Sequence, residues 1–380
     1  MEEAAQAIGI PQTKDRSPEQ RLKDWEDGQD YPTHNQLATV AKAYFRPVLT
    51  FYLAEPPTVE TDVADFRTVG DRELKAPSPK LRALISRMKA KQQQVLDLLR
   101  EEHEQTGVPL EPLQFVGRFR EIRDVNAVAR DIEAELGIRR NDRNLANDND
   151  GLFRYFRYKA EQCGVFVLAQ GDLGHHTTDI DPEDFRGFAL ADPLVPFVVI
   201  NDNDAKAART FTLAHELAHL WIGTSGISNH NPFGRNGADE IDDEKFCNAV
   251  ASELLLPTLQ FEEAWARVDK IDLFNAVRTV ASEFSISRAA TAHRLWREEK
   301  ISEDQWWALY NQYQAEWRAR RARDQGRNQG GPSWYTIKSY QLGNRLKETV
   351  FKALDSGQLT YTRASRILGA SPENLKKLRA

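Results

Sequence analysis

His215, Glu216 and His219 have the residue types and spacing of a catalytic metal site. They form an HExxH motif within the apolar segment 211–221. Residues four apart in a helix lie one turn apart on the same face, so both imidazoles can bind one zinc ion. The intervening glutamate is placed to accept a proton from a water molecule at the metal. The motif therefore predicts metal-assisted peptide hydrolysis; the alternative is a pair of hydrogen-bonded core histidines.

A catalytic zinc site commonly has three protein ligands and keeps a fourth position for water. Glu244 is the candidate for the third ligand, because it opens a second apolar helical segment, which ends at Pro257. Spacing alone leaves other candidates open, namely His230, Glu240, Asp242 and Asp243. We expect the nearby Cys247 to be a core residue. A His2Glu site also accepts Mn²⁺ or Fe²⁺.

Four further residues are candidates for contact with a peptide substrate. A second donor to the developing oxyanion is usually needed, and His230 and Arg235 are the nearest candidates in the following loop. Residues 197–201 have the pattern of a strand. As an edge strand, they could pair with an extended substrate through Val199 and Asn201. An ordinary core strand is the alternative.

These segments resemble the ImmA/IrrE family of metallopeptidases. The similar pieces are residues 211–219, the Glu244-x-x-x-Asn248 helix that ends in Leu254-Leu255-Leu256-Pro257, and the strand before the motif. The resemblance covers about residues 150–297. It implies that His215, His219 and Glu244 hold the metal and that Glu216 is the general base. It also implies a protein substrate of the DNA-binding repressor type.

Composition sets limits on the rest of the chain. At 380 residues the chain is long enough for two or three domains, and 41% hydrophobic with 28% charged residues is typical of a globular protein. No apolar run has the length of a membrane span and the first residues are not those of a signal peptide, so we expect a cytoplasmic protein without membrane contact. Cys163 and Cys247 lack paired spacing, which fits a reducing compartment.

The N-terminal residues 1–56 predict a helix-turn-helix bundle. Short helical segments separated by Gly9 and Gly28 are similar to those of XRE-type DNA-binding domains, although the first helix of that domain is missing, as if the chain were truncated. Residues 1–60 carry 6 basic and 10 acidic residues, a net charge of −4. Because DNA affinity depends on phosphate neutralisation, this balance leaves protein contact as an alternative to DNA binding.

The sequence predicts an α+β fold, mostly helical, with a zincin-like metallopeptidase core at 150–300 that holds a short β-sheet. We expect a helix near 152–162 and strands at 165–169, 185–190 and 197–201. A helical spacer at 57–149 precedes the core. A helical basic module at 301–380 follows it, with a linker at about 318–333 and a weak second helix-turn-helix signal at 360–375.

The C-terminal module is markedly basic. From residue 317 to 380 there are 14 Lys or Arg against 4 Asp or Glu, a net charge of +10. Such a segment can attract nucleic acid or an acidic partner, or it can simply be solvated. Two functions therefore remain open. The first is a zinc endopeptidase that cleaves a repressor-like protein to control transcription or a stress response. The second is a non-proteolytic DNA-binding regulator, or the antitoxin-like partner of a toxin.

Overall fold

The structure, a computed structural model, describes residues 5, 8–12, 16–44, 48–53, 55, 77–139, 149–225, 227–228, 242–325 and 332–379. The chain divides into two units, one of Met1–Thr68 with Arg72–Leu84 and one of Val69–Asp71 with Ile85–Ala380. The HExxH motif and the candidate third ligand both belong to the second unit. The candidate site is therefore contained within one unit.

The first unit contains short helices around a small core. Helix α2 (Pro18–Glu26) begins at Ser17 and α3 (His34–Ala43) at Thr33, and both residues accept a hydrogen bond from the first helical turn. The 3-10 helix η1 (Val48–Tyr52) follows. The apolar side chains that pack together are Ala5, Ile8, Ile10, Leu22 and Val40. Helices of this length agree with the sequence pattern, while an XRE-type fold and DNA binding stay predictions.

A small sheet forms the centre of the second unit. Its four described strands are β1 (Phe166–Ala169), β2 (Gly187–Leu190), β3 (Phe197–Ile200) and β4 (Ile227–Ser228), in the order β1-β3-β2-β4. Strand β1 is parallel to β3, and β2 is antiparallel to both β3 and β4. Every residue of β1, β2 and β3 is buried, as in strands covered on both faces. The chain is thus mostly helical with a small sheet, in agreement with the predicted α+β class.

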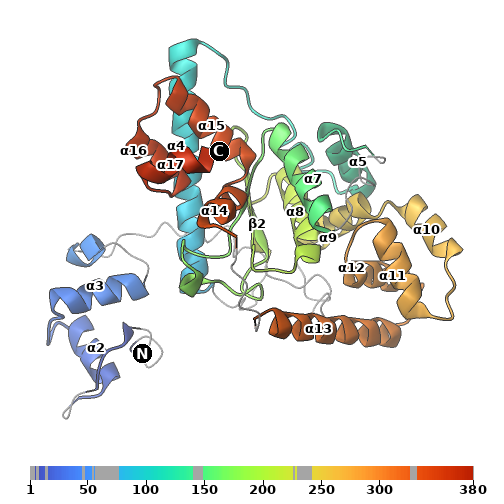
Figure 1. Cartoon of the computed structure of the whole chain (residues 1–380), viewed down its shortest axis with the longest axis horizontal. Helices are drawn as coiled ribbons and strands as arrows, with labels where there is room; N and C mark the ends of the chain where they lie inside the picture. Colours follow the sequence, from blue (N-terminus) through green and yellow to red (C-terminus); the bar gives the residue numbers. More distant parts are fainter. Residues whose placement is uncertain are drawn as a thin grey trace. The chain divides into compact units, whose positions relative to one another are not determined.

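Helices cover this sheet from two sides. In Figure 1, α4 (Pro79–Thr106) and α14 (Trp334–Leu342) lie on one side of β2, and α7 (Asn149–Gln162) and α8 (Lys206–Ile222) lie on the other. Helix α9 (Asp242–Leu255) packs against α8, and α5 (Val125–Glu135) packs against both. Residues of α5 therefore belong to the same hydrophobic core as the metal motif, although the sequence placed them in a separate spacer.

Four helices follow the candidate third ligand. They are α10 (Thr258–Arg267), α11 (Leu273–Glu283), α12 (Arg288–Arg297) and α13 (Glu303–Gln325). Helix α13 extends through residues 318–325, so the first part of the predicted linker is helical. The composition of this segment explains its helical structure, because Glu, Ala, Arg and Gln favour a helix where no Gly or Pro interrupts them.

The C-terminal helices are docked on the core through a buried polar contact. Helix α14 is followed by α15 (Asn344–Asp355), α16 (Tyr361–Leu368) and α17 (Pro372–Arg379). The buried Arg157 side chain donates to Val167 O at 2.6 Å and to Tyr340 O at 2.7 Å. Glu161 Oε1 accepts from Asn344 N at 3.0 Å. Gly343 separates α14 from α15 with a φ of 76°, a conformation open mainly to glycine.

Two basic side chains of these helices pair with acidic residues of α4. Arg363 forms two hydrogen bonds of 2.8 and 2.9 Å with Glu101, and Lys352 lies 2.8 Å from Glu102. Arg379 pairs with Asp355 of α15. The positive charge that the sequence shows in this module therefore serves, in part, to hold the helices together.

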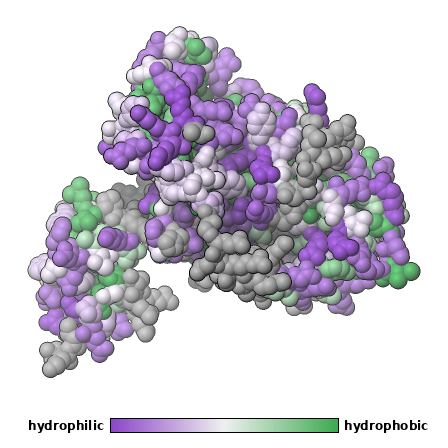
Figure 2. Space-filling model, in the orientation of Figure 1, coloured by the Kyte–Doolittle hydropathy of each residue, from purple (hydrophilic) through white to green (hydrophobic). Residues whose placement is uncertain are grey.

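Hydrophobic residues occupy only small, scattered areas of the described surface shown in Figure 2. Across the described ranges, none of the helices combines the length and apolar character that a bilayer span requires.

Replacing Gly343 should weaken the docking of the C-terminal helices. A Cβ on Gly343 would lie 2.6 Å from Val167 O and would also collide with Glu161 Oε1. Gly357 has nearly the same φ, 75°, but open space around the same position. We expect Gly357→Ala to cost about 1–2 kcal/mol for the backbone conformation alone. Gly343→Ala should cost about 1–3 kcal/mol more, from the overpacking. Urea unfolding of both variants measures the difference, and equal losses would contradict the contact.

The buried Lys91 should make stability depend on pH. Its Nζ donates to Ile367 O at 2.6 Å, and burial, with Lys338 and Arg87 nearby, lowers the pKa of Lys91 to about 7. In the unfolded chain the pKa of a lysine is about 10.4. At pH values between these two pKa values, Lys91 is protonated in the unfolded chain and neutral in the folded chain. The free energy of unfolding should therefore rise with pH from about 7 to about 10.

The substitution Lys91→Met should reduce this rise, whereas Lys376→Met at an exposed position of α17 should leave it unchanged. Urea unfolding at several pH values across this window measures both slopes. An unchanged slope in Lys91→Met would show that another group causes the dependence.

Candidate metal centre

Helix α8 carries the HExxH motif through the interior of the protein. Leu213, Leu217 and Trp221 are fully buried, and His215, Glu216 and His219 are at most 3% exposed. Gly223 ends the helix in the left-handed conformation with φ 71°, as is common for glycine after a helix. A helix with apolar neighbours on all sides is held in place by packing, so the polar residues of the motif keep a defined position.

Contacts at both ends fix the position of α8. At its start, Arg209 donates to the carbonyl of Asp204 and, at 3.0 Å, to the hydroxyl of Tyr340. At its end, Trp221 donates to Asp131 of α5 at 2.7 Å and stacks on Phe115 with ring centroids 4.4 Å apart. These contacts come from segments far apart in the sequence. The metal motif is thus oriented by α5 and by the C-terminal helices.

His215, His219 and Glu244 converge as a potential metal-binding group. Their donor atoms all lie within 4.8 Å of one another. The two Nε2 atoms are 3.0 Å apart, Glu244 Oε2 is 3.2 Å from His215 Nε2, and Glu244 Oε1 is 3.1 Å from His219 Nε2. Donors about 2.0–2.1 Å from a tetrahedral zinc ion lie about 3.3 Å apart. The separation and the nature of the donors therefore fit a zinc ion.

Hydrogen bonds on the opposite side of each ring orient the imidazoles. His215 Nδ1 lies 2.9 Å from Asn248 Oδ1, and His219 Nδ1 lies 2.9 Å from Thr224 Oγ1. When each Nδ1 donates its proton to these oxygens, each Nε2 presents a lone pair to the metal position. Asn248 lies one turn after Glu244, so its role was accessible from spacing. Thr224 follows Gly223 and has no sequence signal of its own.

The three charged groups shift one another's protonation. Burial lowers the pKa of both His215 and His219, but the adjacent Glu244 carboxylate more than compensates, and the pKa of each imidazole is raised. Burial raises the pKa of Glu244, yet the two imidazoles hold it well below its usual range. Because a metal binds neutral imidazole, protons and the metal compete for the same Nε2 atoms.

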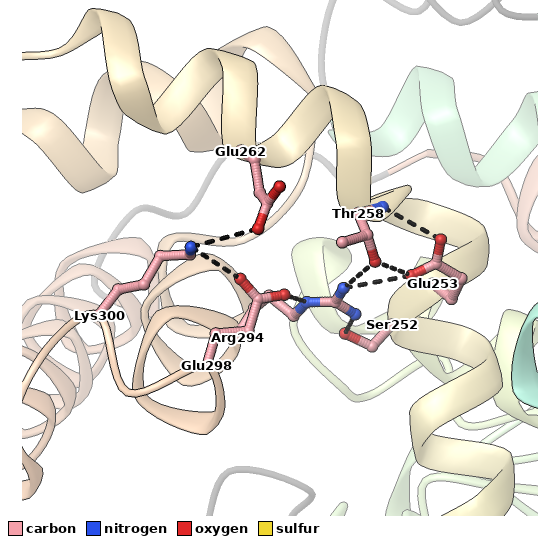
Figure 3. Close-up of polar contacts among 7 residues, drawn as sticks. All are labelled: Ser252, Glu253, Thr258, Glu262, Arg294, Glu298 and Lys300. Atoms are coloured by element: carbon pink, nitrogen blue, oxygen red, sulfur yellow. Dashed lines mark hydrogen bonds and ion pairs between the residues drawn. The ribbon is translucent and has the colours of Figure 1, made fainter.

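Helix α9 is held by polar contacts at both of its ends. At its start, Asp243 accepts from Arg123 at 2.7 Å, so this rival for the third ligand is directed toward the segment before α5. Near its end, Arg294 of α12 donates to Ser252, Glu253 and Thr258 (Figure 3). Glu253 also accepts from Thr258 N at 3.0 Å, at the start of α10. This network joins α9, α10 and α12 beyond the Glu244 position.

The structure separates the predicted site residues into three groups. His215, His219 and Glu244 come together, and Glu216 follows His215 on helix α8. Cys247 is buried and burial raises the pKa of its thiol, which agrees with a core role. His230, Arg235 and the rival Glu240 lie outside the described residues, as does the side chain of Asp242.

The prediction that residues 197–201 form an edge strand is wrong. Strand β3 pairs with β1 on one side and β2 on the other, so it has no free edge for a substrate. Val199 is fully buried within the sheet. Asn201 is also fully buried, and its Nδ2 donates to Ile180 O and Phe185 O. The core-strand alternative is correct, because a strand needs neighbours on both sides to satisfy its backbone in the protein interior.

Comparison with known proteins agrees with this geometry. Residues 167–296 match the model of a peptidase family, described as the IrrE N-terminal-like domain. This range contains the three candidate ligands and Glu216, and covers about a third of the chain. Neither the curated proteins nor the solved structures contain a significant match to the chain. The core thus has the characteristics of a metallopeptidase domain. The match supports its relation to the ImmA/IrrE family, whose members depend on a metal.

Removing the Thr224 hydroxyl should weaken metal binding. Thr224→Val keeps the shape of the side chain but leaves His219 Nδ1 without its acceptor, whereas Thr224→Ser keeps the hydroxyl. Loss of such a partner typically lowers metal affinity by about 10–100-fold. We therefore expect this loss in Thr224→Val and little change in Thr224→Ser, measured by competition with a zinc chelator. Equal affinities of the two variants would show that the hydroxyl does not orient His219.

Proposed function

We propose that this chain is a zinc-dependent endopeptidase of the ImmA/IrrE type that cleaves a repressor-like regulatory protein. The observation that carries the proposal is the convergence of His215, His219 and Glu244, with their donor atoms within 4.8 Å of one another. The family match at residues 167–296 supports the reaction class. The substrate is inferred from the resemblance to the family, and its cleavage would control transcription or a stress response.

The residues of the site then have separate roles. His215, His219 and Glu244 hold the ion, and Asn248 and Thr224 orient the two imidazoles. A zinc ion bound there would supply Lewis acidity, which polarises the scissile carbonyl and favours ionisation of water. Glu216 accepts the proton of the attacking water and transfers it to the leaving amine. Glu216 is completely buried, so its carboxylate is shielded from bulk water.

The substitution Glu216→Gln tests the reaction. It keeps the size of the side chain and leaves the three metal donors unchanged, but removes the base. General acid–base catalysis contributes about 10²–10⁴-fold, so hydrolysis should fall by at least a hundredfold while one zinc per chain is retained. The substrate can be a proteome-derived peptide library, with new N termini counted by mass spectrometry. Glu263→Gln, at an exposed position of α10, is the matched control.

Cleavage that persists in Glu216→Gln or in chelator-treated protein would refute the enzymatic function. The substrate class has its own test. New protein N termini are mapped in cells that express the wild-type chain or Glu216→Gln. Transcriptional repressors should be among the proteins cleaved by the wild type alone, and a set without any DNA-binding regulator would contradict that part of the proposal.

A further inference from the structure

Gly187 lies where a side chain would collide with the candidate general base. It is the first residue of β2, and it pairs with Ile200 of β3 and Ser228 of β4. A Cβ placed on Gly187 would lie 3.0 Å from Glu216 Oε1, 3.2 Å from Glu216 Cγ and 2.6 Å from Thr212 Cγ2. Non-bonded heavy atoms are most favourable at about 3.5–4.0 Å. The strand can approach α8 this closely only because residue 187 has no side chain.

The backbone itself does not require glycine at this position. The φ of Gly187 is outside the positive region, so an L-residue can adopt the same conformation. Glycine inside a strand also costs about 0.5–1 kcal/mol relative to alanine. The other residues of β2 are the apolar Phe188, Ala189 and Leu190, which pack in the core. The reason for glycine is therefore the space that it leaves in front of α8.

Thr212 and Glu216 are four residues apart, so they lie on the same face of α8, one turn from each other. This face is directed at Gly187, whereas His215 and His219 are directed at Glu244 of α9. The closeness of β2 therefore determines where the Glu216 carboxylate can lie beside the metal-binding group.

We propose that Gly187 is a positioning residue for Glu216. Its missing side chain provides the space that the carboxylate occupies, and any larger residue would displace that carboxylate. The catalytic consequence rests on the proposed peptidase function, but the steric coupling between the two positions does not.

The Thr212→Ser background isolates the contact with Glu216. A side chain at position 187 would strike two groups, the Thr212 methyl and the Glu216 side chain. Thr212→Ser removes the methyl and keeps the hydroxyl, which donates to Ala208 O at 3.2 Å. In this background, an alanine at position 187 would still clash with the Glu216 side chain but no longer with a methyl group at position 212.

A double-mutant cycle in metal-free protein tests the steric coupling. In the Thr212→Ser background, Gly187→Ala should lower the thermal midpoint by about 2–4 °C, the shift typical of modest overpacking in a chain of this size. After Glu216→Ala is added, the same Gly187→Ala change should lower the midpoint by less than half as much. An equal loss with and without the Glu216 side chain would overturn the proposal.

Kinetics of the zinc-loaded protein test the catalytic consequence. Relative to Thr212→Ser alone, Thr212→Ser with Gly187→Ala should lower kcat at least tenfold, with KM within about twofold and one zinc per chain, because a displaced base affects mainly the chemical step. An unchanged kcat would overturn the positioning role. If the Thr212→Ser and wild-type proteins both fail to cleave the peptide library, the proposed function is refuted instead, and the double-mutant cycle still decides the steric claim.

Discussion

The pairing of one carboxylate with two imidazoles is the interaction on which the centre of this protein depends. Glu244 lies 3.1–3.2 Å from His219 and His215, and all three side chains are largely or fully buried. Polar and ionisable groups are costly to bury unless they are paired or bind a metal. The contact therefore requires α8 and α9 to be held in one arrangement. Arg123, in the segment before α5, and the Arg294 network contribute to this from opposite ends of α9.

The C-terminal helices contribute to the same scaffold. Tyr340 accepts from Arg209 at the start of α8, and Gln341 donates to Asp202 in the loop that leads into that helix. The buried Arg157 connects α7 to the backbone of the same C-terminal segment. Tyr340 and Gln341 follow the metal motif by more than a hundred positions. The metallopeptidase-type core is consequently completed by chain segments outside the range that matches the IrrE N-terminal-like domain.

The spacing of apolar residues and the positions of Gly and Pro predicted most helices and strands near the site. The helix before the sheet and the strands β1, β2 and β3 lie where alternation and apolar runs placed them. Two predictions were wrong for different reasons: the edge position of β3 and the start of the linker at residues 318–325. An apolar strand is buried whether it is central or at an edge, so β3 could not be assigned a place in the sheet from its own residues. The predicted linker was read from charge, but Arg-rich segments are also good helix formers, and α13 continues to Gln325.

The sequence by itself determined the local chemistry: two imidazoles and a carboxylate on adjacent turns of one apolar helix, because helical spacing is a property of the chain alone. It also indicated Glu244 as a partner without excluding its rivals. Tertiary structure decided that Glu244 meets both imidazoles, that Asn248 and Thr224 orient them, and that Gly187 leaves space for Glu216. These decisions depend on how helices and strands pack, and contacts between distant segments are not encoded in any local pattern.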